Sequence, residues 1–183
     1  ITSYSFSSTV GSFTSIVGQP GTVQQNTGAD DTSYGTFPIG FSFNYNGTAY
    51  TTFGVSANGF MSMGASPTSS YVAISGGTTN NIIVPMNNDL LGLVANGSAM
   101  AYQLSGAPGS QVLTYEWQNW GIYNAGTANN EFSFQIKLYE GSNVIQFVYQ
   151  NGPATGSINV QVGLRGTSNA QYVNRTTTTD WTA

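Results

Sequence analysis

The sequence contains no cysteine and no histidine, and only 5% of its 183 residues are charged. Without these two residue types there is no Ser-His-Asp or Cys-His nucleophile, no zinc site of imidazole or thiolate ligands, and no disulfide. Three lysine and arginine residues against seven aspartate and glutamate residues give a net charge of −4. The basic stripe that neutralises nucleic-acid phosphates is missing, so nucleic acid and anionic membranes are not expected partners.

Long apolar runs are also missing. No run approaches the roughly 20 consecutive apolar residues that cross a bilayer, so membrane insertion is not expected. The chain begins at Ile1 with neither an initiator methionine nor a basic leader, which indicates a processed secreted protein or an excerpt of a longer chain. Both readings predict an extracellular or cell-surface location. The lack of disulfides does not contradict export, because a chain of this size can bury a sufficient core.

Apolar residues recur with a period of two almost throughout the sequence, and no window shows the spacing of an amphipathic helix. Residues 131–139 place Phe132, Phe134 and Ile136 on one face, as in a half-buried antiparallel strand. Asn46-Gly47 is a strong hairpin signal within residues 37–60. Further strands are expected at 2–7, 71–74, 82–86, 99–104, 111–120, 143–149 and 157–164. These features predict a single all-β domain over residues 1–183, a two-sheet antiparallel sandwich or jelly roll.

A series of motifs resembles a β-sandwich module of large secreted proteins of Bacteroidetes-type bacteria, which are often exported by the type-nine route. The motifs fall in the expected order between Tyr4 and Trp181: Phe37–Phe43, Tyr45-Asn46-Gly47, Tyr50, Ser56–Phe60, Asn88-Asp89-Leu90, Ala101-Tyr102, Gly106-Ala107-Pro108, Glu116–Trp120, Phe134–Glu140 and Asn143–Tyr149. The resemblance implies a structural, adhesive or scaffold role on a bacterial surface. It carries no catalytic motif, and the C-terminal sorting segment of such proteins is missing here.

Three glutamates allow a glycosidase hypothesis, because small jelly-roll hydrolases use a pair of carboxylates across a groove. The three are Glu116, Glu131 and Glu140. Their neighbours do not match known hydrolase motifs, so no catalytic residue is expected. The favoured interpretation of Glu116 is a cross-strand ion pair with Lys137, with Arg165 nearby.

Aromatic residues near position 120 could form a platform for a sugar ring. Trp117, Trp120 and Tyr123, with Tyr115, are the candidates for glycan contact. Strand alternation places Tyr115 and Trp117 on the face opposite Trp120, so part of the set must be core. Burial of Trp117 between the sheets is the favoured alternative.

Acidic and amide side chains at two loops are the only candidates for a cation site. Asp30 and Asp31 form one pair, and Asp89 follows Asn87 and Asn88. Their oxygens could bind calcium, but they lack the regular spacing of a dedicated calcium loop, so a turn-forming role is favoured and no cofactor is expected.

The low charge and the first residues together predict a function. Few charges remove the repulsion and the edge lysines that keep sheet proteins monomeric. Tyr4 and Phe6 alternate with serine and threonine, which predicts a strand at the chain end that could complete a neighbour's sheet. We therefore expect a non-catalytic extracellular module that associates with copies of itself into a filament or array. The alternative is a carbohydrate-binding or adhesive module of a larger secreted protein, with polysaccharide as its partner.

Overall fold

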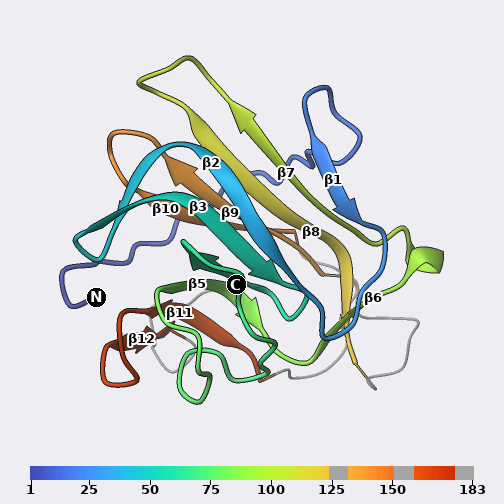
Figure 1. Ribbon diagram of the computed structural model, residues 1–183. Coiled ribbons are helices and arrows are strands. Elements are labelled where there is room, and N and C mark those ends of the chain that lie inside the picture. The colour runs from blue at the N-terminus through green and yellow to red at the C-terminus, as the bar shows by residue number, and fades with distance from the viewer. Residues whose placement is uncertain (124–131, 151–158, 176–183) are drawn as a thin grey trace.

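The computed structural model describes residues 1–123, 132–150 and 159–175, and these form two antiparallel sheets packed face to face (Figure 1). The predicted all-β sandwich is confirmed. The described strands are β1 (Val23–Asn26), β2 (Ser33–Tyr45), β3 (Thr48–Ser56), β4 (Phe60–Met63), β5 (Ile82–Asn87), β6 (Leu90–Gly92), β7 (Ala99–Ser105), β8 (Val112–Ile122), β9 (Phe132–Tyr139), β10 (Ile145–Gln150), β11 (Gln161–Arg165) and β12 (Tyr172–Asn174). One short 3-10 helix, η1 (Val94–Asn96), precedes β7.

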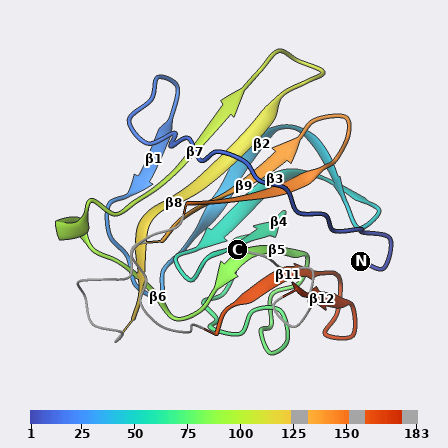
Figure 2. The same cartoon turned by 180° about the vertical axis from the view of Figure 1, so that it is seen from behind.

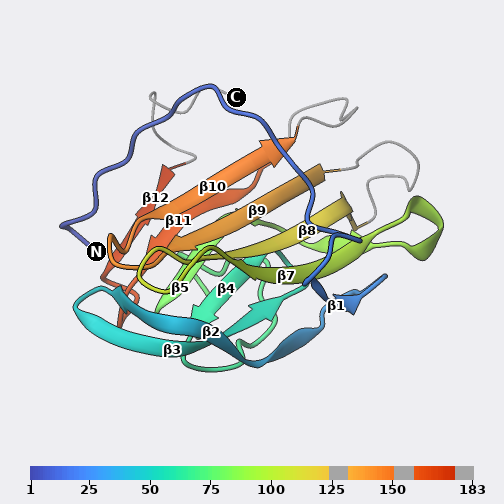
Figure 3. The same ribbon diagram turned by 90° about the horizontal axis from the view of Figure 1, so that it is seen from above.

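The two sheets have simple strand orders. Sheet A runs β1-β7-β8-β9-β10, with β6 paired to the end of β8, and sheet B runs β12-β11-β5-β4-β3-β2. Figure 3 shows the two layers from above, with β2 and β3 on one side and β7 to β10 on the other. In the described part of the chain no helix is long and apolar enough to span a bilayer.

The core forms where the alternating apolar faces of the two sheets meet. In sheet A, Tyr115, Trp117 and Phe134 are fully buried, and the rings of Trp117 and Phe134 stack with centroids 5.1 Å apart. From sheet B, the ring of Phe53 meets that of Tyr115 edge-on at 5.9 Å. Each such ring removes roughly 150–250 Å² from water, so this cluster dominates the hydrophobic stabilisation.

Two predicted strands are wrong. Residues 2 and 3 form a turn in which the Tyr4 N–H donates to Ile1 O at 3.1 Å, and residues 4–7 pair with no strand of the described chain. Residues 71–74 instead lead into a tight turn at 73–76, in which the Gly76 and Gly77 N–H groups donate to Val72 O at 2.8 and 2.9 Å. A β-carbon on Gly77 would lie 2.8 Å from Ala73 O, so glycine is what permits this turn.

The first sixteen residues, called here the N-terminal segment, cross the outer face of sheet A before the chain enters β1. Figures 2 and 3 both show the segment running from the β11–β12 side across β10 and β9 toward β8. It therefore covers polar side chains that alternation alone would leave in water.

Candidate functional site

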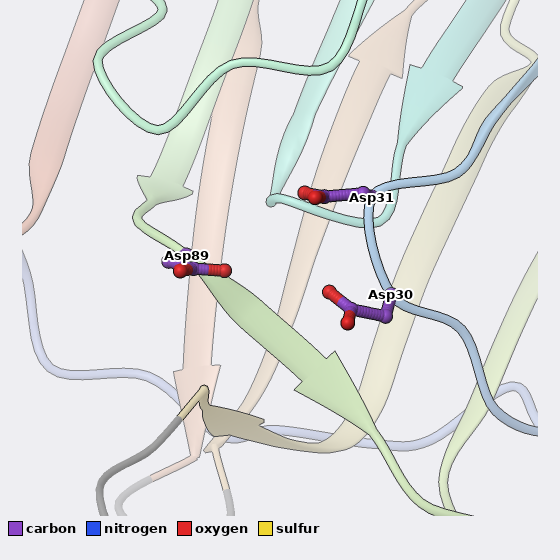
Figure 4. A group of neighbouring side chains, drawn as sticks. All are labelled: Asp30, Asp31 and Asp89. Atoms are coloured by element: carbon purple, nitrogen blue, oxygen red, sulfur yellow. The ribbon is translucent and has the colours of Figure 1, made fainter.

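Three carboxylates from two distant loops meet at one end of the sandwich. Asp30 and Asp31 directly precede β2, and Asp89 lies in the turn between β5 and β6. The Asp30 backbone bridges to Leu91 of β6, which brings the two loops together. Oxygen atoms of the three side chains lie within 4.8 Å of one another (Figure 4). The structure thus gathers the three aspartates that the sequence offered as calcium ligands.

Asp31 is fixed by neutral donors. Its Oδ1 accepts from Asn58 Nδ2 at 2.9 Å and Ser69 Oγ at 3.1 Å, and its Oδ2 accepts from the Tyr71 hydroxyl at 2.7 Å. These hydrogen bonds lower the pKa of Asp31, and the bond from Tyr71 has the largest effect. The bond to Asp31 in turn raises the pKa of Tyr71 to about 12. Asn58 is fully buried, and its Oδ1 accepts from Leu90 N–H at 2.8 Å, so one amide links both loops.

Asp30 and Asp89 have a different electrostatic environment. Partial burial, and then the charge of Asp31, raise the pKa of both carboxyls. Asp89 Oδ1 is buried and has no hydrogen-bond partner in the described structure. Calcium binds carboxylate oxygens, and here three carboxylates lie close together and one of their oxygens is buried without a partner in the described structure. This arrangement suits a cation of the calcium class.

The two asparagines named with these aspartates have the turn-forming role that the sequence favoured. Asn87 Oδ1 accepts from Ala73 N–H at 2.7 Å, and its Nδ2 donates to Asn58 O at 2.6 Å. Asn88 Oδ1 accepts from the next backbone N–H at 2.6 Å, and its Nδ2 donates to Asn159 O. Their side chains hold loops rather than complete the carboxylate cluster.

Glu116 occupies a second polar site, on the outer face of sheet A. The expected ion pair is wrong, because Lys137 lies opposite Thr114 and Glu116 lies opposite Gln135. Glu116 is fully buried beneath the N-terminal segment. Its Oε1 accepts from Ser15 Oγ at 2.6 Å, and its Oε2 accepts from Ile16 N–H at 2.8 Å and Gln135 Nε2 at 2.7 Å.

The other charged groups named beside Glu116 lie elsewhere. Arg165 of β11 is buried in sheet B, where its guanidinium donates to the carbonyls of Ala73 and Gly77 and to Asn80 Oδ1. Glu140 lies beyond the other end of β9, and its Oε2 accepts from Gly109 N–H at 2.8 Å. Glu131 falls outside the described residues. Glu116 and Glu140 therefore do not form a carboxylate pair across a groove.

Comparison with known proteins identifies the type of domain. A family model described as NIDO related matches residues 3–183. The chain belongs to this NIDO-related family. The family relation indicates an extracellular type of domain. No curated protein and no solved structure matches the chain. The resemblance to modules of Bacteroidetes-type bacteria stays a prediction.

The proposed sugar platform is not present in this NIDO-related domain. Trp117 and Trp120 are fully buried, and their indole N–H groups donate to Ser56 O at 3.1 Å and Ala57 O at 2.8 Å. A bulge between the two tryptophans puts both into the core, which simple alternation could not predict. Of the four aromatic residues named as candidates for glycan contact, Tyr123 alone is exposed, at 40%.

Tyr4 and Phe6, the residues expected in a donated strand, pack against the core of their own chain. The Tyr4 ring lies 5.7 Å from that of Tyr45, and its hydroxyl accepts from Asn46 N–H at 3.0 Å. The Arg175 guanidinium lies 4.5 Å above the Phe6 ring. These contacts lie within the chain itself and are made by side chains, not by a strand, and donation to a second copy stays a prediction.

Proposed function

We propose that this NIDO-related domain is a secreted, non-catalytic structural module that associates with copies of itself by exchanging its N-terminal segment. The proposal rests on one observation: the segment is bound at its two ends, and the residues between are exposed. The sequence suggested that a strand is donated to a neighbouring copy. We propose exchange of the whole segment instead, because residues 1–16 form no β-ladder in the described chain.

The first bound end lies at the β2–β3 turn. Ile1 is 8% exposed, and its amino group donates to Asn46 Oδ1 at 2.6 Å. Tyr4 and Phe6 add their ring contacts. These are side-chain and terminal contacts that the same segment of a second copy could make without change.

The second bound end lies on sheet A. Ser15 and Ile16 donate to Glu116, and Thr14 O accepts from Gln135 Nε2 at 2.9 Å. Between the two ends, residues 7–12 are exposed, Val10 completely so. Gly11 meets no atom within 4 Å at the position of an added β-carbon. An exposed connection with glycine is the kind of hinge through which identical elements exchange.

The low charge of the domain supports association. Three basic and seven acidic residues in 183 leave little like-charge repulsion between copies. Because the exchanged contacts are apolar or buried, an assembly built on them should persist in 1 M salt.

Size-exclusion chromatography with light scattering at micromolar concentration, together with negative-stain imaging, tests the proposal. We expect oligomers or filaments for the full chain, and folded monomers after removal of residues 1–8. Val10→Ser is the matched control, because Val10 is fully exposed and should not affect assembly. A monodisperse full-length monomer, or assembly that persists after the truncation, would contradict segment exchange.

A second candidate, a polysaccharide-binding module, is favoured by two exposed tyrosines near the carboxylate cluster. Tyr71 is 46% exposed and donates to Asp31, and the backbone N–H of Tyr123, which is 40% exposed, donates to Asp89 O at 2.8 Å. Aromatic faces beside carboxylates suit sugar recognition. A polysaccharide pull-down should lose binding with Tyr71→Ala or Tyr123→Ala and keep it with Tyr172→Ala, an exposed tyrosine of β12. No binding by the parent chain would exclude this function.

A further inference from the structure

We propose that Asp30, Asp31 and Asp89 bind one divalent cation of the calcium class at the loop end of the sandwich. The proposal does not depend on self-association. It concerns a site that the regular spacing rules for calcium loops do not detect, because its ligands come from positions about sixty residues apart in sequence.

The spacing of the oxygens fits a single ion. Calcium binds oxygen at about 2.3–2.6 Å, so two oxygens on opposite sides of one ion lie roughly 4.6–5.2 Å apart. The carboxylate oxygens of the three aspartates lie within 4.8 Å of one another. Figure 4 shows the three side chains directed into the same space. These separations are compatible with one cation bound by all three carboxylates.

The buried Asp89 Oδ1 is the second, independent observation. This atom is shielded from solvent and accepts no hydrogen bond from the described residues. Buried side-chain acceptors without a partner are rare in folded proteins. By contrast, both oxygens of Asp31 are satisfied by Asn58, Ser69 and Tyr71. A cation between the loops would satisfy Asp89 and could take the second lone pair of Asp31 Oδ2, which accepts one hydrogen bond.

The charge of the cluster is not neutralised by the chain's own cations. Lys137 lies on β9 opposite Thr114, Arg165 donates to carbonyls in sheet B, and Arg175 lies over Phe6. These are all the basic side chains of the sequence. The three carboxylates therefore repel one another at close range, and a divalent cation would offset this repulsion.

The ligand arrangement favours calcium over magnesium. Magnesium needs near-ideal octahedral geometry at 2.0–2.1 Å and retains several waters, whereas calcium accepts six to eight oxygens in irregular arrangements. Here the ligands stand on two loops with unequal burial, and only one of them is held by several hydrogen bonds. Water and backbone carbonyls would complete the shell.

Calcium titration of the full chain, followed by isothermal calorimetry and thermal unfolding at constant ionic strength, tests the site. We expect one binding event and a saturable rise of several degrees in Tm relative to EDTA, because a ligand that binds only the folded chain stabilises it. Asp89→Asn should weaken calcium affinity at least ten-fold and abolish the rise. In EDTA the same variant should be at least as stable as the parent, because it removes one repelling charge.

Glu140→Gln is the matched control, because it removes the same charge beyond the opposite end of β8, where Glu140 contacts Gly109. It should keep the full calcium response. Asp30→Asn, at an exposed position, provides a second test if Asp89→Asn fails to fold. The proposal is overturned by no heat and no Tm shift at 10 mM calcium, by an undiminished response in the aspartate variants, by an equal loss in Glu140→Gln, or by an equal response to magnesium.

Discussion

Replacement of Glu116 tests how the N-terminal segment is held. In Glu116→Ala, the Ile16 N–H and the Gln135 amide lose their acceptor, and both are buried. A buried donor without an acceptor costs about 1–3 kcal/mol, and bonds to a charged group are at the upper end. The expected loss is therefore about 3–5 kcal/mol, a large part of the 5–15 kcal/mol typical of whole domains.

Urea unfolding at neutral pH, with the m-value held in common, measures this loss. Glu116→Gln keeps one acceptor oxygen but turns an amide NH₂ toward existing donors, so we expect roughly 1–3 kcal/mol. Hydrogen exchange at the Ile16 amide gives a local measurement, because release of the segment should remove its protection.

Glu140→Gln is the control for loss of one negative charge. We expect a loss of about 1 kcal/mol or less, because glutamine keeps one oxygen that can accept from the Gly109 and Gln111 N–H groups. A loss below about 1 kcal/mol for Glu116→Ala, or unchanged protection of the Ile16 amide, would refute the role of this carboxylate.

Two further predictions concern packing and pH. Gly92→Ala should lower the free energy of unfolding by about 1–3 kcal/mol in urea, because an added β-carbon would lie 2.3–2.6 Å from ring atoms of Trp120. In EDTA, Tm should rise as pH falls from neutral toward the ordinary aspartate pKa of 3.8, because the raised pKa values of Asp30 and Asp89 favour proton binding by the folded chain. The lowered pKa of Asp31 opposes this only below that window. A pH profile unchanged in the Asp30→Asn, Asp89→Asn double variant would contradict the assignment.

The alternation of apolar residues predicted the sandwich because it reports a local property. Phe134 and Ile136 are core residues of β9, as their period of two indicates. The same rule does not report which residues of β8 and β9 lie opposite one another. Glu116 was therefore assigned to Lys137, whereas it lies opposite Gln135.

The candidate site was less predictable than the fold. Asp30 and Asp89 become neighbours only through pairing of β6 with β8 and the bridge to Leu91. No spacing rule in a single sequence reports such a pairing. The alternation of Tyr4 and Phe6 predicted a strand, but alternation cannot tell a strand from a segment held by side-chain contacts.

The anchoring of residues 15 and 16 to Glu116 has a consequence for the order of folding. About one hundred residues separate the two partners. The segment is synthesised first, yet its binding surface on β8 and β9 is complete only after residue 139 has left the ribosome. Until then Ser15 and Ile16 lack their partner Glu116 in the finished sheet, whereas the partners of Tyr4 at residues 45 and 46 are made early. Segment exchange, as proposed above, would have this interval in which to join two neighbouring nascent chains.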